Sequence, residues 1–468
     1  MDKEELHMLN TTAIRTIEAE KENLIALAHK MWVEPETAYN EVKAAQWTAE
    51  VLKDYGFEVE TGAYNLPTCV VGRWGSGHPV IGFLGELDAL PGMSQKLSTE
   101  KDPIVAGGAG QGCGHNLLNV SALAAVVGLK AELEEKKLPG TVVFYGCPAE
   151  EVLTGKVFMA REGAFTDLDA CFAWHGDSVN RVMTGKHTGL NSAIFHFKGR
   201  TAHAGGDPHN GRSALDAAEI MSVGANYLRE HVTSDVRIHY VYKEAGTAPN
   251  IVPDKAAVWY YVRAFNREAI EDTYNRLVKV AEGAAHMTET ELEIEFLGGC
   301  YNTQPNMYMA GMTYEIMKEV ELPQYTEEEL AFADALNKNS PNYQAVLASG
   351  KLEKGPIFEG MSSFQTTDNY GSTDVGDVQY IVPCVQVRTA CWNQAAPGHS
   401  WQITACSDMG IGFKGMLYGA KVMAAAAMAM YEDPTHIEKA KAEFDEKMKV
   451  KPYKCPIPKE VPIPQPQV

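Results

Sequence analysis

Residue types that bind metals stand at regular places along this chain, and their order constrains the fold more than any other feature. Cys113 and His115 lie two residues apart, where a Gly-rich loop enters a predicted helix. A β-rich run then ends in Glu150-Glu151, and the next apolar run ends in His175. Polar groups at the ends of successive strands are how an α/β enzyme assembles a site. The pattern therefore predicts an α/β fold with a metal centre.

Each of these residues has an ordinary explanation when taken alone. A lone cysteine is usually a small buried hydrophobe, a lone histidine is usually a core or surface residue, and paired glutamates are common on solvated helix ends. The combination favours metal binding, because Pro397-Gly398-His399-Ser400 adds a further histidine. Five donors, more than a four-coordinate structural site uses, suggest two divalent ions with positions open to water. The predicted ligands are Cys113, His115, Glu151, His175 and His399.

The sequence also resembles the M20 peptidase family, in its amidohydrolase branch with Cys-x-His ligands. The motifs that carry the resemblance are Gly85-Glu86-Leu87-Asp88-Ala89-Leu90-Pro91, Gly112-Cys113-Gly114-His115-Asn116, Glu150-Glu151, His175 and Gly398-His399-Ser400. Within that branch, the run 85–92 and Gly371-Ser372-Thr373-Asp374-Val375-Gly376-Asp377 resemble the aminobenzoyl-glutamate utilization B group. The resemblance extends from about residue 15 to about residue 430. It implies an enzyme that cleaves amide bonds of N-acyl amino acids.

This resemblance implies roles for the acidic residues of the motifs. Neighbouring residues on an extended strand end point to opposite sides, so we expect one glutamate of the pair to bind metal and the other to face the bound water. By resemblance, Glu150 is the general base, which then passes its proton to the leaving nitrogen. Asp88 matches an aspartate that orients a ligand. Glu86 stands where distant members have a metal-binding histidine, and it is left out of the ligand set.

A second polar set, His203, Asn250 and Arg263, lies in the middle of the chain. Without the resemblance these would be turn and surface residues. The resemblance implies that His203 reaches across a dimer interface to stabilise an oxyanion, while Asn250 and Arg263 hold the substrate carboxylate. A guanidinium suits a carboxylate geometrically, and preorganised charge lowers the barrier at an oxyanion. Asp374 and Asp377 either line the same cleft or form a solvated acidic turn.

The alternation of helices and strands predicts a mostly parallel sheet with helices on both faces. The expected helices are 11–31, 40–55 and 117–138, and the expected strands are 69–74, 80–84, 141–147 and 170–174. An inserted α+β two-layer lid, of order βαββαβ, follows. Its expected elements are strand 192–198, helix 213–231, strands 236–242 and 256–263, helix 267–287 and strand 291–296.

These elements divide the chain into a catalytic domain at 1–188 and 303–468 and a lid and dimerisation domain at 189–302. In the second catalytic part, the α/β pattern resumes at 307–320, and the Ala- and Met-rich segment 416–431 is expected to be a buried helix. The acidic stretch 322–360 is expected to form a surface excursion over the active-site mouth. The tail, 452–468, holds six prolines and is expected to be extended on the surface or disordered.

Charge and cysteine content limit the partners and the compartment. A formal charge of -20 without a dense basic run disfavours nucleic acid and anionic membranes. The start, Met1 to Glu5, lacks the apolar core of a signal peptide, and no uncharged span of membrane length is found. Nine scattered cysteines show no disulfide spacing, so a cytoplasmic protein is expected.

The most specific function we predict is hydrolysis of p-aminobenzoyl-glutamate to p-aminobenzoate and glutamate. The alternatives are hydrolysis of indole-acetyl amino acids or β-alanyl dipeptides, and a non-catalytic partner subunit. Thiolate and imidazole donors suit zinc, whereas the resemblance favours manganese. The partner through the lid is either a second copy of this chain or a paralogous subunit.

Overall fold

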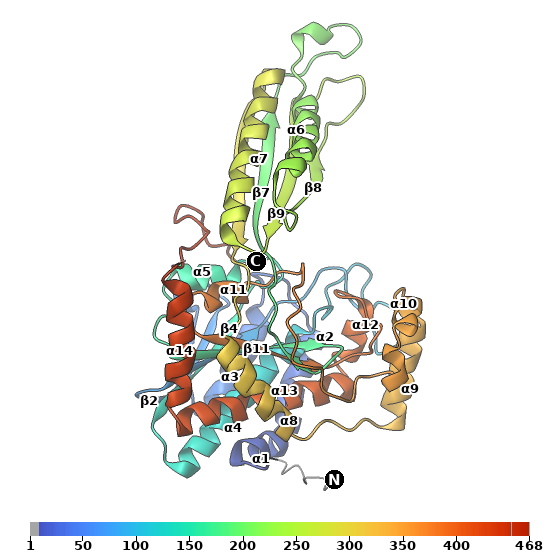
Figure 1. Cartoon of the computed structure of the whole chain (residues 1–468). Helices are drawn as coiled ribbons and strands as arrows, with labels where there is room; N and C mark the ends of the chain where they lie inside the picture. Colours follow the sequence, from blue (N-terminus) through green and yellow to red (C-terminus); the bar gives the residue numbers. More distant parts are fainter. Residues whose placement is uncertain (1–8, 451, 468) are drawn as a thin grey trace.

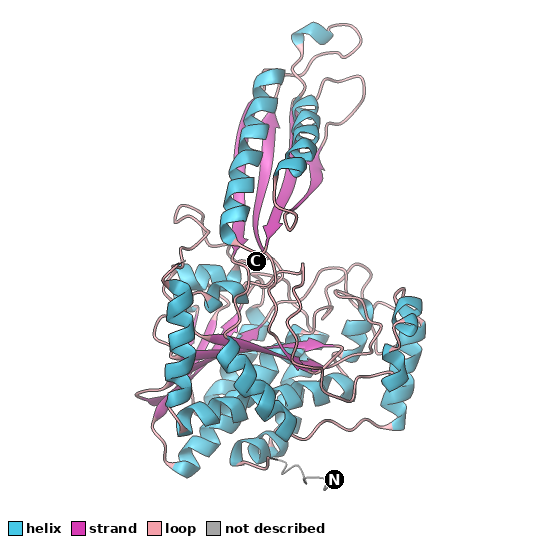
Figure 2. Ribbon diagram, in the orientation of Figure 1, coloured by secondary structure: helices cyan, strands magenta, loops and turns pink. Residues whose placement is uncertain are grey.

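The computed structural model describes residues 9–450 and 452–467 and shows two domains stacked one above the other (Figure 1). The lower domain is a sheet covered by helices, and the upper domain is a narrow lid (Figure 2). The first residues, Met1 to Glu5, on which the signal-peptide prediction rests, lie outside the described residues.

The lower domain is built on a mixed sheet, seven-stranded within the described residues. Its strands are β1 (Glu58–Thr61), β2 (Val70–Ser76), β3 (Val80–Glu86), β4 (Gly140–Cys147), β5 (Ala170–Asp177), β6 (Arg181–Val182) and β11 (Cys384–Ala390). They lie in the order β1-β2-β4-β3-β5-β11-β6. The four strands β4, β3, β5 and β11 are parallel, whereas β1, β2 and β6 pair antiparallel at the edges. The α/β prediction is confirmed, with parallel pairing confined to the centre of the sheet.

Each face of this sheet has its own apolar core, because successive strand residues point to opposite faces. Phe83 and Phe172 stack at 5.5 Å in the larger core, while their neighbours Leu84 and Ala173 belong to the other. The helices of this domain are α1 (Thr12–Ala19), α2 (Lys21–Val33), α3 (Val42–Asp54), α4 (His115–Lys136), α5 (Gly155–Arg161), α8 (Met307–Glu319), α11 (Val375–Gln379), α12 (Trp401–Cys406), α13 (Gly410–Glu432) and α14 (Thr435–Met448).

Helix α4 is the central element of the larger core. It is long and apolar enough to cross a membrane by composition, in contrast to the sequence-based expectation, but 89% of its most apolar stretch is buried. It packs against α13, α1, α2 and the central strands. Helix α13 is buried as predicted. A core helix of a globular domain explains the apolar character of α4.

Two segments differ from the prediction. The stretch 322–360 contains helices, α9 (Glu327–Lys338), α10 (Tyr343–Ala348) and the 3-10 turn η4 (Lys351–Lys354), on one side of the domain (Figure 1). Thr326 and Glu329 form a capping box that starts α9, a signal that was present in the sequence. The tail is ordered: Tyr453 donates to Asp377 at 2.9 Å, and Ile457 is buried against the smaller core.

The lid is a four-stranded antiparallel sheet with two long helices on one face (Figure 2). Its elements are β7 (Gly189–Lys198), η2 (Pro208–Asn210), α6 (Ala214–Leu228), η3 (Arg229–His231), β8 (Arg237–Glu244), β9 (Lys255–Ala264), α7 (Arg267–Thr288) and β10 (Glu291–Cys300). The strand order is β10-β7-β9-β8, and the predicted βαββαβ sequence is found. Since Gly189 pairs with Ala264 and Lys198 with Lys255, both strands run between the domain junction and the far tip.

Candidate metal centre and substrate pocket

The predicted metal ligands converge at the carboxyl ends of the central strands. His175 lies on β5, and the loop that enters α4 carries Cys113 and His115. Gly114 between them has a φ of 76°, a left-handed conformation that favours glycine, and a Cβ there would lie 3.3 Å from the Trp392 ring. This turn lets the thiol and the imidazole face one place.

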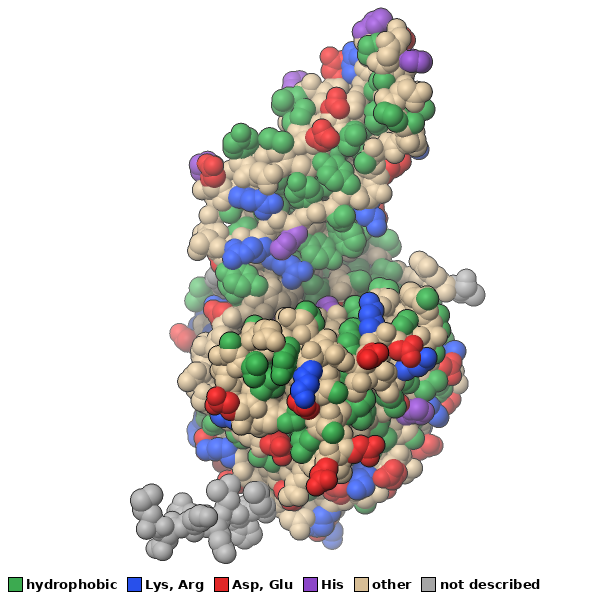
Figure 3. Space-filling model, turned by 90° about the vertical axis from the view of Figure 1, so that its right-hand side faces the viewer, with side chains coloured by type: hydrophobic (Ala, Val, Ile, Leu, Met, Phe, Trp, Pro, Cys, Tyr) green, Lys and Arg blue, Asp and Glu red, His purple; other side chains and the backbone are tan. Residues whose placement is uncertain are grey.

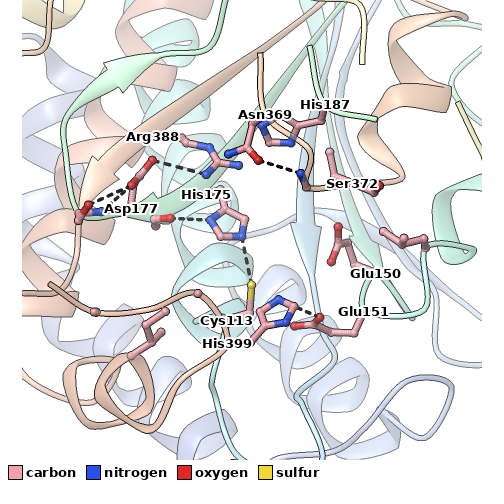
Figure 4. Close-up of a pocket in the computed structure, with 18 of the residues that line it drawn as sticks. Cys113, Glu150, Glu151, His175, Asp177, His187, Asn369, Ser372, Arg388 and His399 are labelled. Carbon is pink, nitrogen blue, oxygen red and sulfur yellow. Dashed lines mark hydrogen bonds and ion pairs between the residues drawn. The ribbon is translucent and has the colours of Figure 1, made fainter. Parts of the chain in front are cut away.

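The five predicted ligands form two triads that share one thiol. Cys113 with His115 and His175, and Cys113 with Glu151 and His399, each bring three donor atoms within 4.8 Å of one another. Cys113 Sγ lies 3.3 Å from His175 Nε2, and His399 Nε2 lies 3.5 Å from Glu151 Oε2 (Figure 4). Donor sets of this type suit zinc or manganese, and the shared Cys113 fits a pair of ions.

Hydrogen bonds fix which nitrogen of each buried imidazole is free. His115 Nδ1 donates to the Asp88 carbonyl at 2.9 Å, and His175 Nδ1 donates to the Gly176 carbonyl at 2.5 Å. Each ring therefore presents Nε2 to the centre. Among the described residues, His115 Nε2, Glu151 Oε1 and Glu86 Oε2 are buried without a hydrogen-bond partner. Buried polar atoms without partners are costly, so their convergence fits a bound cation.

A turn directs both glutamates into the pocket, which corrects the strand-end argument. Strand β4 ends at Cys147, and Ala149 takes a φ of 56°, so the pair lies on a turn rather than on an extended strand. Asp88 holds this turn by accepting from Glu150 N at 3.1 Å and Glu151 N at 2.9 Å. Both glutamates line the pocket. Glu151 belongs to the triad with Cys113, whereas Glu150 groups with His115 and Glu86.

Burial leaves the donors poised to bind a cation. It raises the pKa of Glu150 well above its ordinary value, with Glu86 and Asp374 adding to the effect. Burial likewise raises the pKa of Glu151 to about 7, and that of the Cys113 thiol to about 12. Cations nearby would lower these values and release protons, because metal ligands bind in their deprotonated forms. The residues present therefore fit the metal that the donor pattern implies.

Asp374 does not line the pocket, contrary to the substrate-binding role predicted for it. It is fully buried and binds Lys156 Nζ at 2.7 Å, and the same lysine binds Glu86 Oε1 at 2.6 Å. Asp377 is also buried and accepts from Tyr301 N and the Tyr453 hydroxyl. The acidic pair is neither a cleft wall nor a solvated turn, because each carboxylate is enclosed by its own partners.

The pocket lies between the two domains, where Figure 3 shows a hollow below the lid. It has a volume of about 400 Å³, within the range of small-molecule sites. The lining residues that the sequence did not single out include Asp177, His187, Asn369, Ser372, Arg388 and Trp392. One signal was present: Asp177 follows His175 by two residues on a strand, which places both side chains on one face.

The lid residues are split between the pocket and the far tip. Arg263 lines the pocket, and its Nη1 donates to Ser372 Oγ at 3.2 Å. His203 and Asn250 lie beyond the distal ends of β7 and β9, where His203 forms a bridge with Ile251. His203 Nδ1 accepts from Gly205 N and Gly206 N at 3.1 and 3.0 Å, so its Nε2 carries the proton. The chain's own pocket contains neither residue.

Comparison with known proteins matches residues 185–288 to the peptidase dimerisation domain of the M20 family. The chain is 37% identical to one of the two p-aminobenzoyl-glutamate hydrolase subunits of Escherichia coli, covering 95% of this chain and 96% of that protein. It is 28% identical to the other subunit of the same hydrolase, over 58% of this chain and 62% of that protein. It is 27% identical to mouse Xaa-Arg dipeptidase, over 94% and 93% of the two chains.

Solved structures share the fold. An aminobenzoyl-glutamate utilization protein from Klebsiella pneumoniae has a TM-score of 0.60 at 17% identity, covering 88% of this chain and 97% of that one. A dinuclear metal-binding M20 peptidase from Bacillus subtilis has a TM-score of 0.58 at 19% identity, covering 89% and 99%. The 37% identity to the E. coli protein extends over nearly the whole length of both chains. The chain therefore belongs to the M20 peptidase family and is a hydrolase that acts on amide bonds.

Proposed function

We propose that this protein hydrolyses the amide bond of p-aminobenzoyl-glutamate, giving p-aminobenzoate and glutamate. The observation that carries the proposal is the pocket, where five metal donors and Glu150 lie beside Arg263, a cation suited to a carboxylate. The 37% identity to one chain of a p-aminobenzoyl-glutamate hydrolase supports this substrate among N-acyl amino acids.

Each residue of the chain has a defined task in this reaction. Two bound divalent ions, for which we favour manganese over zinc, would polarise the amide carbonyl and make a water molecule more acidic. Glu150 accepts a proton from the attacking water and delivers it to the leaving nitrogen. Asp88 holds the turn that carries Glu150 and fixes the tautomer of His115. Arg263 orients the substrate through its carboxylate.

We further propose that two lids associate and that His203 completes the site of the partner. The match to a dimerisation domain supports association, and the distance of His203 from its own pocket supports action in trans. His203 Nε2–H is a donor suited to an oxyanion. We propose a homodimer; the alternative is a heteromer with a paralogous subunit. Nine free cysteines among the described residues support our proposal of a reducing, cytoplasmic location, which cell fractionation would test.

A panel of substrates tests the proposed activity. Metal-loaded protein is assayed with p-aminobenzoyl-glutamate, indole-acetyl-aspartate, a β-alanyl dipeptide and a dipeptide ending in arginine. We expect the highest kcat/KM for p-aminobenzoyl-glutamate. A higher value for another substrate would move the assignment within the family, whereas inactivity on all of them would favour a subunit that requires a partner.

A further inference from the structure

We propose that the pocket contains a second anion subsite, formed by Arg388, His187 and Asn369, which selects substrates whose amino-acid part has an acidic side chain. Arg263 would hold one carboxylate of such a substrate and this subsite the other. The inference rests on the proposed function, because it concerns the substrate of the same pocket.

Strand register places Arg388 beside the metal donors. Arg388 pairs with His175 across the parallel strands β11 and β5, so both side chains leave the same face of the sheet. On the other side of β11, Arg388 pairs with Arg181 of β6. Figure 4 shows the Arg388 guanidinium next to Asn369 and His187, across the pocket from Glu151.

The charges at this wall do not balance. Asp177 Oδ2 lies 2.7 Å from Arg181 Nη2 and 3.5 Å from Arg388 Nη1, so one carboxylate serves two guanidinium groups. Arg388 has the longer contact, and its buried Nε has no hydrogen-bond partner among the described residues. A guanidinium has five N–H donors. Arg388 therefore retains both charge and donors for an anion in the pocket.

His187 provides independent support for a ligand at this place. Its side chain lines the pocket, the residue is only 4% exposed, and its Nε2 has no hydrogen-bond partner within the described part of the chain. The backbone is fixed, since His187 N donates to Thr303 Oγ1 at 2.6 Å and the residue forms a bridge with Asn369. An enclosed polar atom of this kind is costly until a ligand pairs with it.

Asn369 completes the wall between the two arginines. Its Oδ1 accepts from Gly371 N at 2.8 Å, which leaves the amide N–H groups as donors. Ser372, one residue beyond Gly371, accepts from Arg263. The order Arg388, Asn369 and His187, Ser372, Arg263 thus gives the pocket a cationic group at each end of one wall, as a dicarboxylate requires.

Binding to metal-loaded Glu150→Gln protein tests the subsite without turnover. The ligands are p-aminobenzoyl-glutamate and p-aminobenzoyl-glutamine, which differ only in the charge of the side chain, and affinities are measured by calorimetry. We expect the glutamate ligand to bind roughly 10- to 100-fold more tightly, as for a lost charged hydrogen bond. Adding Arg388→Gln should abolish this preference while leaving the affinity for the glutamine ligand unchanged, and Arg388→Lys should restore part of it.

The matched control is Arg237→Gln, which removes a charge from the base of the lid, where Arg237 stacks on Tyr370 outside the pocket lining. It should retain the preference. Equal binding of both ligands by the starting protein, an equal loss of both on Arg388→Gln, or loss of the preference on Arg237→Gln would overturn the subsite. Failure of the proposed function is distinct, because wild-type protein would then prefer the glutamate ligand without cleaving it.

Discussion

Lys156 is the only buried cation behind the metal donors among the described residues, and it compensates two carboxylates. Its ammonium group lies between Glu86 and Asp374, and the side chains of all three are at most 3% exposed. Burial opposes its charge, but Asp374 and Glu86 raise the pKa of Lys156 well above its ordinary value. The lysine thus holds one oxygen of Glu86 and leaves the other toward His115, 3.3 Å away.

Replacing Lys156 by methionine should destabilise the catalytic domain. Two buried carboxylates would lose their cation, and breaking a buried pair in this way costs about 3 to 5 kcal/mol. Urea denaturation of the metal-free protein measures the change. Lys338→Met, which removes an exposed partner of Asp334, is the control and should have no measurable effect. Equal stability of Lys156→Met and wild type would show that the charges are screened by water.

Glu150→Gln should retain the metal ions and the fold while losing turnover by roughly 10²- to 10⁴-fold, the usual contribution of a general base. Turnover and metal content are measured on the same sample. Glu151→Gln is the matched comparison and should lose metal as well as activity. If Glu150→Gln lost metal and Glu151→Gln kept it, the two roles would be reversed.

At this scale the ligands were predictable, because Cys-x-His, Glu-Glu and two histidines each stand in a short motif. Arg388 and Lys156 were not. Their importance depends on neighbours from distant parts of the chain: Arg388 becomes meaningful only once β11 is aligned with β5, and Lys156 only once α5 contacts the segment at Asp374.

At the scale of elements, the lid followed from its pattern because its strands alternate polar and apolar residues and its helices have an apolar face. Strand β11 and the tail were harder to predict. The tail has no periodic pattern, and its position depends on single contacts: Arg161 Nη1 donates to the carbonyls of Pro458 and Val461. Contacts of this kind leave no regular signal in a sequence.

The contact between Asp377 and the tail predicts a pH dependence of stability. Burial raises the pKa of Asp377 from 3.8 to about 7 in the folded protein. The folded state then binds the proton more tightly than the unfolded state, so this contribution is complete below about pH 4 and is lost as the pH rises through 7. Asp377→Asn should remove it, and the stability difference between variant and wild type should change by up to about 4 kcal/mol across this range.

Denaturation of metal-free protein between pH 4 and pH 8 measures this difference. Asp433→Asn is the control, because hydrogen bonds from Thr435 lower the pKa of this exposed carboxyl and the dependence should not be reproduced. Parallel curves for Asp377→Asn and wild type would contradict the assignment.

At the scale of the whole molecule, the site is divided between the base of the lid and its tip. Arg263 reaches the pocket of its own chain, whereas His203 and Asn250 lie at the other end of a ten-residue strand. The sequence placed all three in one functional set through family resemblance. Their separation emerges only from the strand register, which depends on pairing over the length of the lid.

Mixing two inactive proteins tests the division. His203→Ala and Glu150→Gln are combined under conditions that allow subunit exchange, and a hybrid dimer would contain one site with an intact Glu150 and a donated His203. Activity should partly return. Absence of recovery despite demonstrated exchange would mean that His203 does not act on a second copy of this chain.

The central claim is that this chain is a hydrolase that works through a pair of bound cations, and metal titration tests it most directly. Protein stripped with a chelator is titrated with Mn²⁺ while hydrolysis of p-aminobenzoyl-glutamate and bound metal are followed together. The account predicts no activity in the stripped protein and full recovery at close to two ions per chain, reduced in parallel by Cys113→Ala. Full activity after exhaustive chelation would contradict it.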